Sequence, residues 1–576
     1  MKEAKALSGS SPRMTTIIVH EESAGEQRQT FFIPLLLMAL SWAVVALLSF
    51  FAVMELKAPK PVPATAAANE FSAERAMLHV NQIARAPHPL GSANAGAVRE
   101  YLIAQLSALG LNPQVFPAIG VHKNGRNVVV GSTHDIIGRL PGSSSSKAVM
   151  LMAHYDSVDT APGAADDGAA VAAILEAVRA LRNGSPALKN DLIVLFTDGE
   201  EAGLLGAEAF ASSHPWAKDV GIVLNFEARG DRGPSMLFET SGNNRPLIEA
   251  FAKADSHPIA SSLFYSLYKL LPNDTDLTVF RPLGVPGLNF AFGENLQSYH
   301  STLDTPQNFS PASLQHHGDH ALSLAREFGH TDLNHLRKGG DDVFFNWFGG
   351  GLVHYGQIWV IPGELIVTAL LLLLVLLGVR KAEVRLNRIL LALLPCLALV
   401  IAIPSMMALT GWLIFRLLGG HMLLTDSPAN AYLLAGLVLA GTCSGLLLFK
   451  AFSRRFSPQE LSFSGLLLLG VINWAVTLLL PAGSYLVFWP LLSALVAMLA
   501  INVAGKWHGE SLQWLAGFAG LVSSVLLFAP LAYLLYIFLT LQWLTVAAIG
   551  LLLSFGFLAS SFSLNAMMPR RGSRPL

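Results

Sequence analysis

Four apolar runs in the first half of the chain each end at, or shortly before, a side chain that can bind a metal ion. These side chains are His154 after 148–153, Glu200 and Glu201 after 192–196, Glu227 after 223–226 and His300 after 285–292. A pair of acids, Asp166-Asp167, stands between them in the stretch APGAADDGAA. Four coincidences of this kind are hard to assign to chance, so we interpret these groups together as one site.

The combined set offers two imidazoles and three carboxylates without a thiolate. Such nitrogen and oxygen ligands suit Zn²⁺, or Mn²⁺ and Co²⁺, rather than an iron–sulfur cluster or Cu(I). Two divalent cations close together repel each other, so a two-metal site needs a bridging ligand, for which the Asp166 carboxylate is the natural candidate. Each imidazole ligand also needs an acceptor for its second N–H. Asp156 and Asp304 are well spaced for that role.

Each group taken alone has a simpler structural interpretation. Asp166-Asp167 could be a solvated turn, and Glu200-Glu201 could be an ordinary acidic pair at a helix start. Glu227 is more informative, because a carboxylate at the end of a buried strand is costly unless it is paired or bound to metal. The metal-site hypothesis therefore depends on the combination.

The elements around these residues predict an α/β domain. Continuous Val, Ile and Leu runs alternate with stretches of helical composition at 99–109 and 168–181. This pattern is typical of a mostly parallel sheet flanked by helices. Ligands of such sheets bind at the carboxyl ends of the strands, where the candidate residues stand.

The composition of the whole chain excludes a purely soluble enzyme. Of 576 residues, 52% are hydrophobic and 13% charged, about half the charged share of an ordinary soluble protein. The net charge of −1 provides no basic field for nucleic acid, so we expect a lipid bilayer and no nucleic acid as partners. The two cysteines, Cys396 and Cys443, lie far apart in apolar runs, which excludes a disulfide framework and a cysteine-rich zinc site.

The apolar residues are concentrated in two regions, and this distribution predicts the domain organisation. A tail at 1–30 precedes a run at 31–54 that is long enough to be a transmembrane signal anchor. The α/β domain is expected at 57–345, a membrane domain of about seven helices at 358–562 and a basic tail at 563–576. The seven expected spans are 358–379, 390–415, 430–449, 462–480, 484–504, 514–537 and 543–562, with a turn at 540–542 between the last two.

Charges in the loops predict the orientation in the membrane. Lys and Arg cluster at 380–388, 450–455, 506 and 570–574, whereas the loops at 419–429, 481–483 and 538–542 contain neither residue. Under the positive-inside rule, both termini are cytoplasmic and the α/β domain lies on the other side. Since that domain contains no cysteine, a bacterial periplasm is favoured over an organelle lumen.

Around the candidate ligands the chain resembles the M28 family of zinc peptidases. The matching stretches are MAHYDSVDTAPGAADDGAA, LFTDGEEAGLLGAEAF, LNFEARG and YHSTLDTP. RAPHPLGSANAGAVREYL is similar to the entry segment of the membrane-bound branch, which includes the endoplasmic reticulum metallopeptidases and the fungal vacuolar membrane proteases. The resemblance covers about 75–330. It implies a di-zinc metallopeptidase that acts on a peptide or protein, with aminopeptidase activity as the first expectation.

The resemblance also implies individual roles. It assigns His154, Asp166 and Glu227 to one zinc ion, and Asp166, Glu201 and His300 to the other. Glu200 would be the general base, and Tyr299 is implied more weakly as a group that stabilises the oxyanion. The Asp166–Asp167 peptide bond is expected to be cis. Arg229-Gly230-Asp231 receives no role and is most simply a surface loop.

Three alternatives stay open at this point. The same fold supports glutaminyl cyclases, which are acyltransferases with one zinc ion. A non-catalytic binding or scaffold ectodomain would need no Glu200. A transporter with an accessory domain would need ionisable groups in its spans, and these are scarce here.

Overall fold

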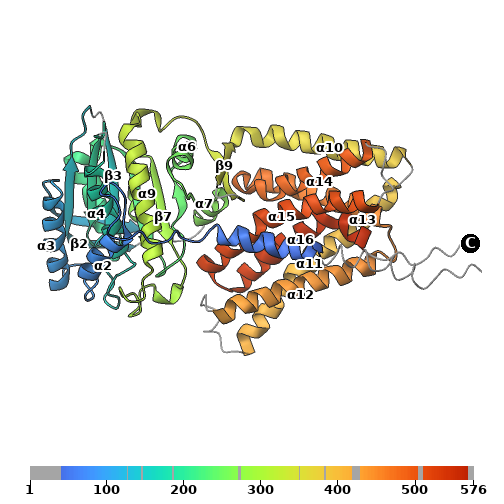
Figure 1. Ribbon diagram of the computed structural model, residues 1–576, viewed down its shortest axis with the longest axis horizontal. Coiled ribbons are helices and arrows are strands. Elements are labelled where there is room, and N and C mark those ends of the chain that lie inside the picture. Colours follow the sequence, from blue (N-terminus) through green and yellow to red (C-terminus); the bar gives the residue numbers. More distant parts are fainter. Residues whose placement is uncertain are drawn as a thin grey trace, which may run out of the picture.

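The computed structural model describes two regions joined end to end, an α/β domain and a bundle of long apolar helices (Figure 1). The described residues are 40–125, 127–144, 147–184, 187–269, 274–348, 351–381, 384–417, 428–503 and 510–567. The predicted tail 1–30, the first residues of the predicted anchor and the end of the basic tail lie outside these ranges.

A seven-stranded sheet in the order β1-β2-β4-β3-β5-β7-β6 forms the centre of the α/β domain. Its four central strands are parallel, as the apolar runs predict. They are β3 (Ala148–His154), β4 (Asp191–Thr197), β5 (Val220–Ala228) and β7 (Gly287–Phe292). Every residue of these four strands is buried, which explains why their sequences are continuously apolar rather than alternating.

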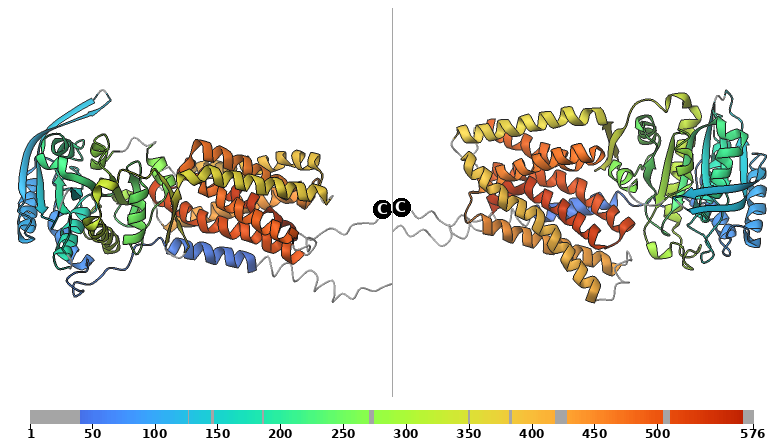
Figure 2. Two further views of the ribbon diagram at one scale, coloured as in Figure 1. Left: turned by 90° about the horizontal axis from the view of Figure 1, so that it is seen from above. Right: turned by 180° about the vertical axis from the view of Figure 1, so that it is seen from behind.

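The outer strands run antiparallel to their neighbours, which the sequence analysis did not anticipate. They are β1 (Gln114–Asn124), β2 (Asn127–Leu140) and β6 (Met236–Thr240), so the complete sheet is mixed. In the β2–β4 register Ile136 pairs with Phe196, close to the end of β4. The rest of the β1–β2 hairpin therefore extends beyond the carboxyl end of the central strands, and Figure 2 shows it projecting from the domain.

Helices cover both faces of the sheet and create two hydrophobic cores. Alternate residues of β3 take part in different cores, Val149 and Leu151 in one and Met150 and Met152 in the other. The larger core includes α2 (Ala73–Ile83), α4 (Gly168–Arg182) and α9 (Pro311–His330), and the smaller one α5 (Leu205–Ser213) and α8 (Asp276–Phe280). The remaining helices of the domain are α3 (Ala93–Ala108), α6 (Arg245–Ala254) and α7 (Ser262–Tyr268).

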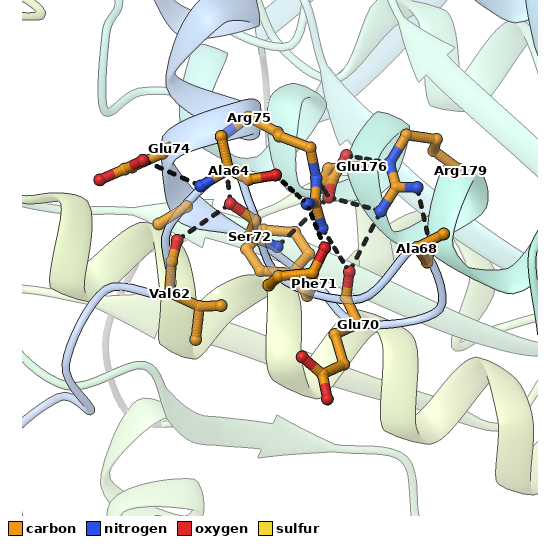
Figure 3. Close-up of polar contacts among 12 residues, drawn as sticks. Val62, Ala64, Ala68, Glu70, Phe71, Ser72, Glu74, Arg75, Glu176 and Arg179 are labelled. Atoms are coloured by element: carbon orange, nitrogen blue, oxygen red, sulfur yellow. Dashed lines mark hydrogen bonds and ion pairs between the residues drawn. The ribbon is translucent and has the colours of Figure 1, made fainter.

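A buried carboxylate, Glu176 of α4, fixes the segment that enters the domain (Figure 3). Its Oε1 accepts hydrogen bonds from Arg75 Nε at 2.7 Å and from the Ser72 amide at 3.2 Å, and Arg179 Nε donates to its Oε2 at 2.6 Å. The two guanidinium groups also donate to main-chain oxygens of residues 64, 66, 68 and 70. These hydrogen bonds to its main-chain oxygens hold the entry segment against the surface of the domain.

The α/β domain also docks directly on the helical bundle. A two-stranded sheet of β8 (Asp342–Trp347) and β9 (Gly351–Gly356) leads from the domain to the first long helix of the bundle. Ser262 Oγ donates to the Ala482 carbonyl at 2.6 Å, Ser261 and Tyr485 share a hydrogen bond of 2.9 Å, and the Tyr485 ring stacks on Phe345. Polar and aromatic contacts together fix the junction.

Within the described residues the bundle has seven helices long and apolar enough to cross a membrane, close to the positions that the sequence predicts. They are α10 (Val360–Arg380), α11 (Leu386–Leu417), α12 (Pro428–Phe452), α13 (Pro458–Leu479), α14 (Tyr485–Val503), α15 (Glu510–Leu539) and α16 (Trp543–Met567). The expected turn at 540–542 separates the last two, with Thr540 in the left-handed region at φ 57°. A shorter apolar helix, Leu40–Met54, is the described part of the predicted anchor and lies beside the bundle (Figure 2).

Where the structure describes them, the basic residues that follow α10 and α12 lie at the end of the bundle away from the α/β domain (Figure 1). Lys381 after α10 donates to Asn502 near the end of α14 at 2.7 Å. Arg388 of α11 pairs with Glu460 of α13 at 3.1 Å. The α13–α14 connection contains neither Lys nor Arg and contacts the α/β domain instead, through Ala482.

Glu176→Ala is expected to destabilise the α/β domain by about 2–3 kcal/mol, because it leaves two guanidinium groups and a main-chain amide without their shared acceptor. Thermal unfolding in detergent, followed by circular dichroism, measures this change. The matched control is Glu74→Ala, which removes one exposed hydrogen bond to Ala64 and should change stability by less than about 1 kcal/mol. Equal effects of the two substitutions would contradict the anchoring role of Glu176.

Candidate metal centre

Two overlapping groups of potential metal ligands lie at the carboxyl edge of the central strands. Within each group the ligand atoms lie within 4.8 Å of one another. The first group is His154, Asp166 and Glu227, and the second is Asp166, Glu201 and His300. The structure thus brings together all five side chains that the sequence predicts as ligands.

His154 stands at the end of β3 with its ring fixed from both sides. Its Nδ1 lies 2.9 Å from the Asp156 carbonyl, and its Nε2 lies 3.2 Å from Asp166 Oδ1 and 3.8 Å from Glu227 Oε2. The carbonyl contact suits a protonated Nδ1 and leaves Nε2 to face the acids. Because the side chain is only 1% exposed, the ring has little freedom to turn away.

Asp166 lies between the two imidazoles and is positioned by Asp304. Its Oδ1 faces His154 and its Oδ2 lies 3.2 Å from His300 Nε2, which is the arrangement a bridging carboxylate needs. Asp304 accepts hydrogen bonds from the main-chain amides of Ala165 at 2.7 Å and Asp166 at 3.2 Å. The sequence analysis expected Asp304 to orient an imidazole, whereas here it holds the loop of Asp166. The Asp166–Asp167 bond is cis, as the family resemblance implied.

Glu200 and Glu201 occupy the turn between β4 and α5, and Asp156 fixes this turn. One Asp156 oxygen accepts the Glu200 amide at 3.1 Å and the other accepts the Glu201 amide at 3.3 Å. Glu201 Oε2 lies 3.1 Å from His300 Nε2, while its buried Oε1 has no hydrogen-bond partner among the described residues. Positive φ angles at Gly199, Gly203 and Leu204 allow the tight turn in which adjacent acids take separate positions.

His300 completes the second group from an irregular segment after β7. It adopts a left-handed backbone conformation with φ 55°, and its carbonyl accepts a hydrogen bond from Thr160 Oγ1 at 3.0 Å. The Tyr299 ring stacks on the His300 imidazole with centroids 3.8 Å apart and remains 37% exposed. Tyr299 therefore lies on the solvent side of the site.

Burial and neighbouring charges strongly shift the pKa values of the acids in this site. Burial raises the pKa of Glu227 to about 8 and that of Glu200 well above its usual range, with further contributions from neighbouring carboxylates. Burial alone would raise the pKa of Asp166 too, but its hydrogen bonds to His154 and His300 lower it. The pKa of His300 rises to about 10 against the effect of burial, because Asp166 and Glu201 favour its cationic form. Such a concentration of negative charge fits a site for divalent cations.

Asp276 is a buried acid beside this site that the sequence analysis did not identify. It is 1% exposed at the start of α8 and accepts a hydrogen bond from Thr197 at the end of β4. Its charge contributes to the raised pKa values of both Glu200 and Glu227. Asp276 does not follow an apolar run, so strand-end spacing gave no signal for it.

Comparison with known proteins identifies relatives of the α/β domain. Residues 135–325 match the model of "Peptidase family M28". Endoplasmic reticulum metallopeptidase 1 of Homo sapiens is 32% identical over 229 residues, 39% of this chain and 25% of that protein. The vacuolar membrane protease of Candida dubliniensis is 31% identical over 285 residues, 47% of this chain and 30% of that protein. The chain thus spans about a quarter to a third of the length of these relatives.

A comparison with solved structures also found similar chains. The aminopeptidase from Aneurinibacillus sp. strain AM-1 is 14% identical with a TM-score of 0.37, over 45% of this chain and 94% of that one. Porphyromonas gingivalis glutaminyl cyclase is 19% identical with a TM-score of 0.37, over 45% of this chain and 99% of that one.

Asp166→Ala is expected to abolish metal binding at both ligand groups and the stabilisation that added zinc would give, because one carboxylate belongs to both groups. Metal analysis of the purified full-length protein after dialysis measures this loss. Asp159→Ala is the matched control, since Asp159 is an exposed acid of the same connection that belongs to neither group. Retention of two metal equivalents by Asp166→Ala would refute the bridging assignment.

Proposed function

We propose that this protein is a membrane-anchored di-zinc metallopeptidase that acts as an aminopeptidase. Residues 135–325 match the model of peptidase family M28, and the chain resembles the membrane-bound branch of that family. The observation that carries the proposal is the pair of ligand groups sharing Asp166, with Glu200 adjacent to them but outside both. A binding or scaffold domain needs no such additional carboxylate.

Zinc fits the ligand set, which supplies imidazole nitrogens and carboxylate oxygens and no thiolate. His154, Asp166 and Glu227 would hold one ion, and Asp166, Glu201 and His300 the other. When bound, the ions would lower the pKa of a water molecule and polarise the scissile carbonyl group.

Glu200 serves as the general base in this proposal. Because it stands beside Glu201 but belongs to neither ligand group, it is free to take a proton from the attacking water and return it to the leaving amine. The Asp156 carboxylate accepts hydrogen bonds from the Glu200 and Glu201 amides and so fixes the turn in which the two side chains point to different positions. Tyr299, which stacks on His300 and is partly exposed, would donate a hydrogen bond from its hydroxyl group to the oxyanion of the tetrahedral intermediate.

Acyl transfer of the glutaminyl cyclase type remains the alternative reaction on this fold. It would use one zinc ion, whereas the described residues offer two ligand groups. Metal stoichiometry of the active protein therefore separates the two reactions.

We also propose that the α/β domain lies outside the cytoplasm, in a bacterial periplasm rather than an organelle lumen, with both termini cytoplasmic. The location of the Lys381–Asn502 and Arg388–Glu460 contacts at the end of the bundle away from this domain supports the proposal.

Glu200→Gln should leave the zinc content near that of the wild type and lower kcat at least about 100-fold, because a proton acceptor is lost while the ligands stay. Zinc analysis and hydrolysis of an aminoacyl-nitroanilide panel measure the two effects. Glu208→Gln is the control, since Glu208 lies on the following helix and faces His122 instead of the ligands. Unchanged turnover in correctly folded Glu200→Gln would remove Glu200 from the mechanism.

Alkaline phosphatase fusions at Gly142 and Pro428 should be active, and fusions at Glu383 and Arg571 inactive, because this enzyme folds only outside the cytoplasm. The first site lies in the α/β domain, and the others test successive loops and the C-terminal tail. Activity at Glu383 would mean that the expected orientation is wrong and that the metal centre faces the cytoplasm.

A further inference from the structure

The segment 293–300, which we call the His300 segment, connects β7 to the metal-ligand candidate His300. Its described conformation contains left-handed residues at Asn295 and His300 and only one short 3₁₀ turn, Leu296–Ser298. Non-glycine residues keep such conformations when surrounding contacts determine them. The position of His300 therefore depends on what holds this segment.

Within the α/β domain, Asp231 holds the His300 segment. Asp231 is fully buried, and its Oδ2 accepts hydrogen bonds from Asn295 Nδ2 at 2.6 Å and from Ser298 Oγ at 2.5 Å. The neighbouring Gly230 packs so closely that an added Cβ would lie 2.1 Å from the Glu294 carbonyl oxygen. The Arg229-Gly230-Asp231 sequence is therefore part of the support of His300 and not the simple surface loop that the sequence suggested.

From the other side, helix α15 of the bundle contacts the same segment. Tyr533 Oη donates to Glu294 Oε2 at 3.3 Å. The Phe538 ring lies against Gly293, where an added Cβ would approach Cε1 to 2.5 Å, and it also lies 6.0 Å from the Phe264 ring. The two contacts fall on adjacent residues at the start of the segment, six and seven positions before His300.

We propose that α15 is a positioning element of the metal centre: Tyr533 and Phe538, together with Asp231, hold the His300 segment so that the imidazole faces Asp166 and Glu201. The metal-binding part of this inference rests on the proposed function. His154 and Glu227 are carried by strands of the central sheet, whereas His300 relies on a segment clamped between the α/β domain and the bundle. The membrane domain would thereby contribute to the second metal site and not only anchor the enzyme.

The test uses the full-length protein in nanodiscs and two α15 variants: the single substitution Tyr533→Phe, and the double substitution Tyr533→Phe plus Phe538→Leu. The control is Tyr485→Phe. Tyr485 also bonds across the junction, but to Ser261 and not to the His300 segment. Asp231→Asn provides the comparison from within the α/β domain.

The first measurement is hydrogen exchange of the amides at 293–303 in metal-free protein. The double variant and Asp231→Asn should exchange about tenfold faster there than the wild type, and Tyr533→Phe a few-fold faster. Tyr485→Phe should leave these amides unchanged. Exchange at 293–303 that equals the wild type in both α15 variants, or that rises equally in the Tyr485→Phe control, would overturn the proposal.

The second measurement is stepwise zinc affinity by competition with a chromophoric chelator. The α15 variants should bind the weaker zinc equivalent about tenfold less tightly and the tighter equivalent as the wild type does. Equal loss at both sites would mean general destabilisation and would overturn selective positioning. Wild-type protein that binds no zinc would instead refute the proposed function, while the exchange measurement still decides whether α15 holds the segment.

Discussion

The arrangement of the α/β domain depends on one electrostatic constraint: several carboxylates and two imidazoles share a small, largely buried volume. Two groups of three ligand atoms, each within 4.8 Å, meet at Asp166, and burial together with the neighbouring carboxylates raises the pKa of Glu227 to about 8. Such groups stay together only if hydrogen bonds and cations compensate their mutual repulsion. The carboxylates of Asp156 and Asp304 therefore bind main-chain amides and hold two ligand loops against that repulsion.

The rigid central sheet keeps some of these side chains in place. His154 and Glu227 emerge from strands that are buried along their whole length, so their side chains start from fixed positions. Asp166, Glu201 and His300 come from loops, and each loop is hydrogen-bonded to another part of the structure. The strongest of these hydrogen bonds are accepted by carboxylates, because a charged acceptor with two N–H or O–H donors orders a loop better than a neutral contact does.

The sequence predicted the central strands because a buried parallel strand is an uninterrupted apolar run. His154 and Glu227 stand directly at the ends of such runs, whereas Asp166, Glu201 and His300 lie in the connections and their roles were implied by the family resemblance. The antiparallel outer strands, the contacts of Asp304 and the burial of Asp231 left no such signal. They are set by packing between residues far apart in the chain, as in the contact between Tyr533 and Glu294.

The double attachment of the α/β domain has a thermodynamic consequence. The chain enters the domain from the apolar helix Leu40–Met54, part of the predicted anchor, and leaves it into α10, so with both ends in the bilayer the two ends of the domain would stay close together even when it unfolds. Like a covalent cross-link, such a restraint would raise the free energy of the unfolded chain, by an amount on the order of 5 kcal/mol for a loop of this length in the chain-entropy treatment. The bilayer would thus act on the α/β domain as a disulfide does, in a domain whose sequence contains no cysteine.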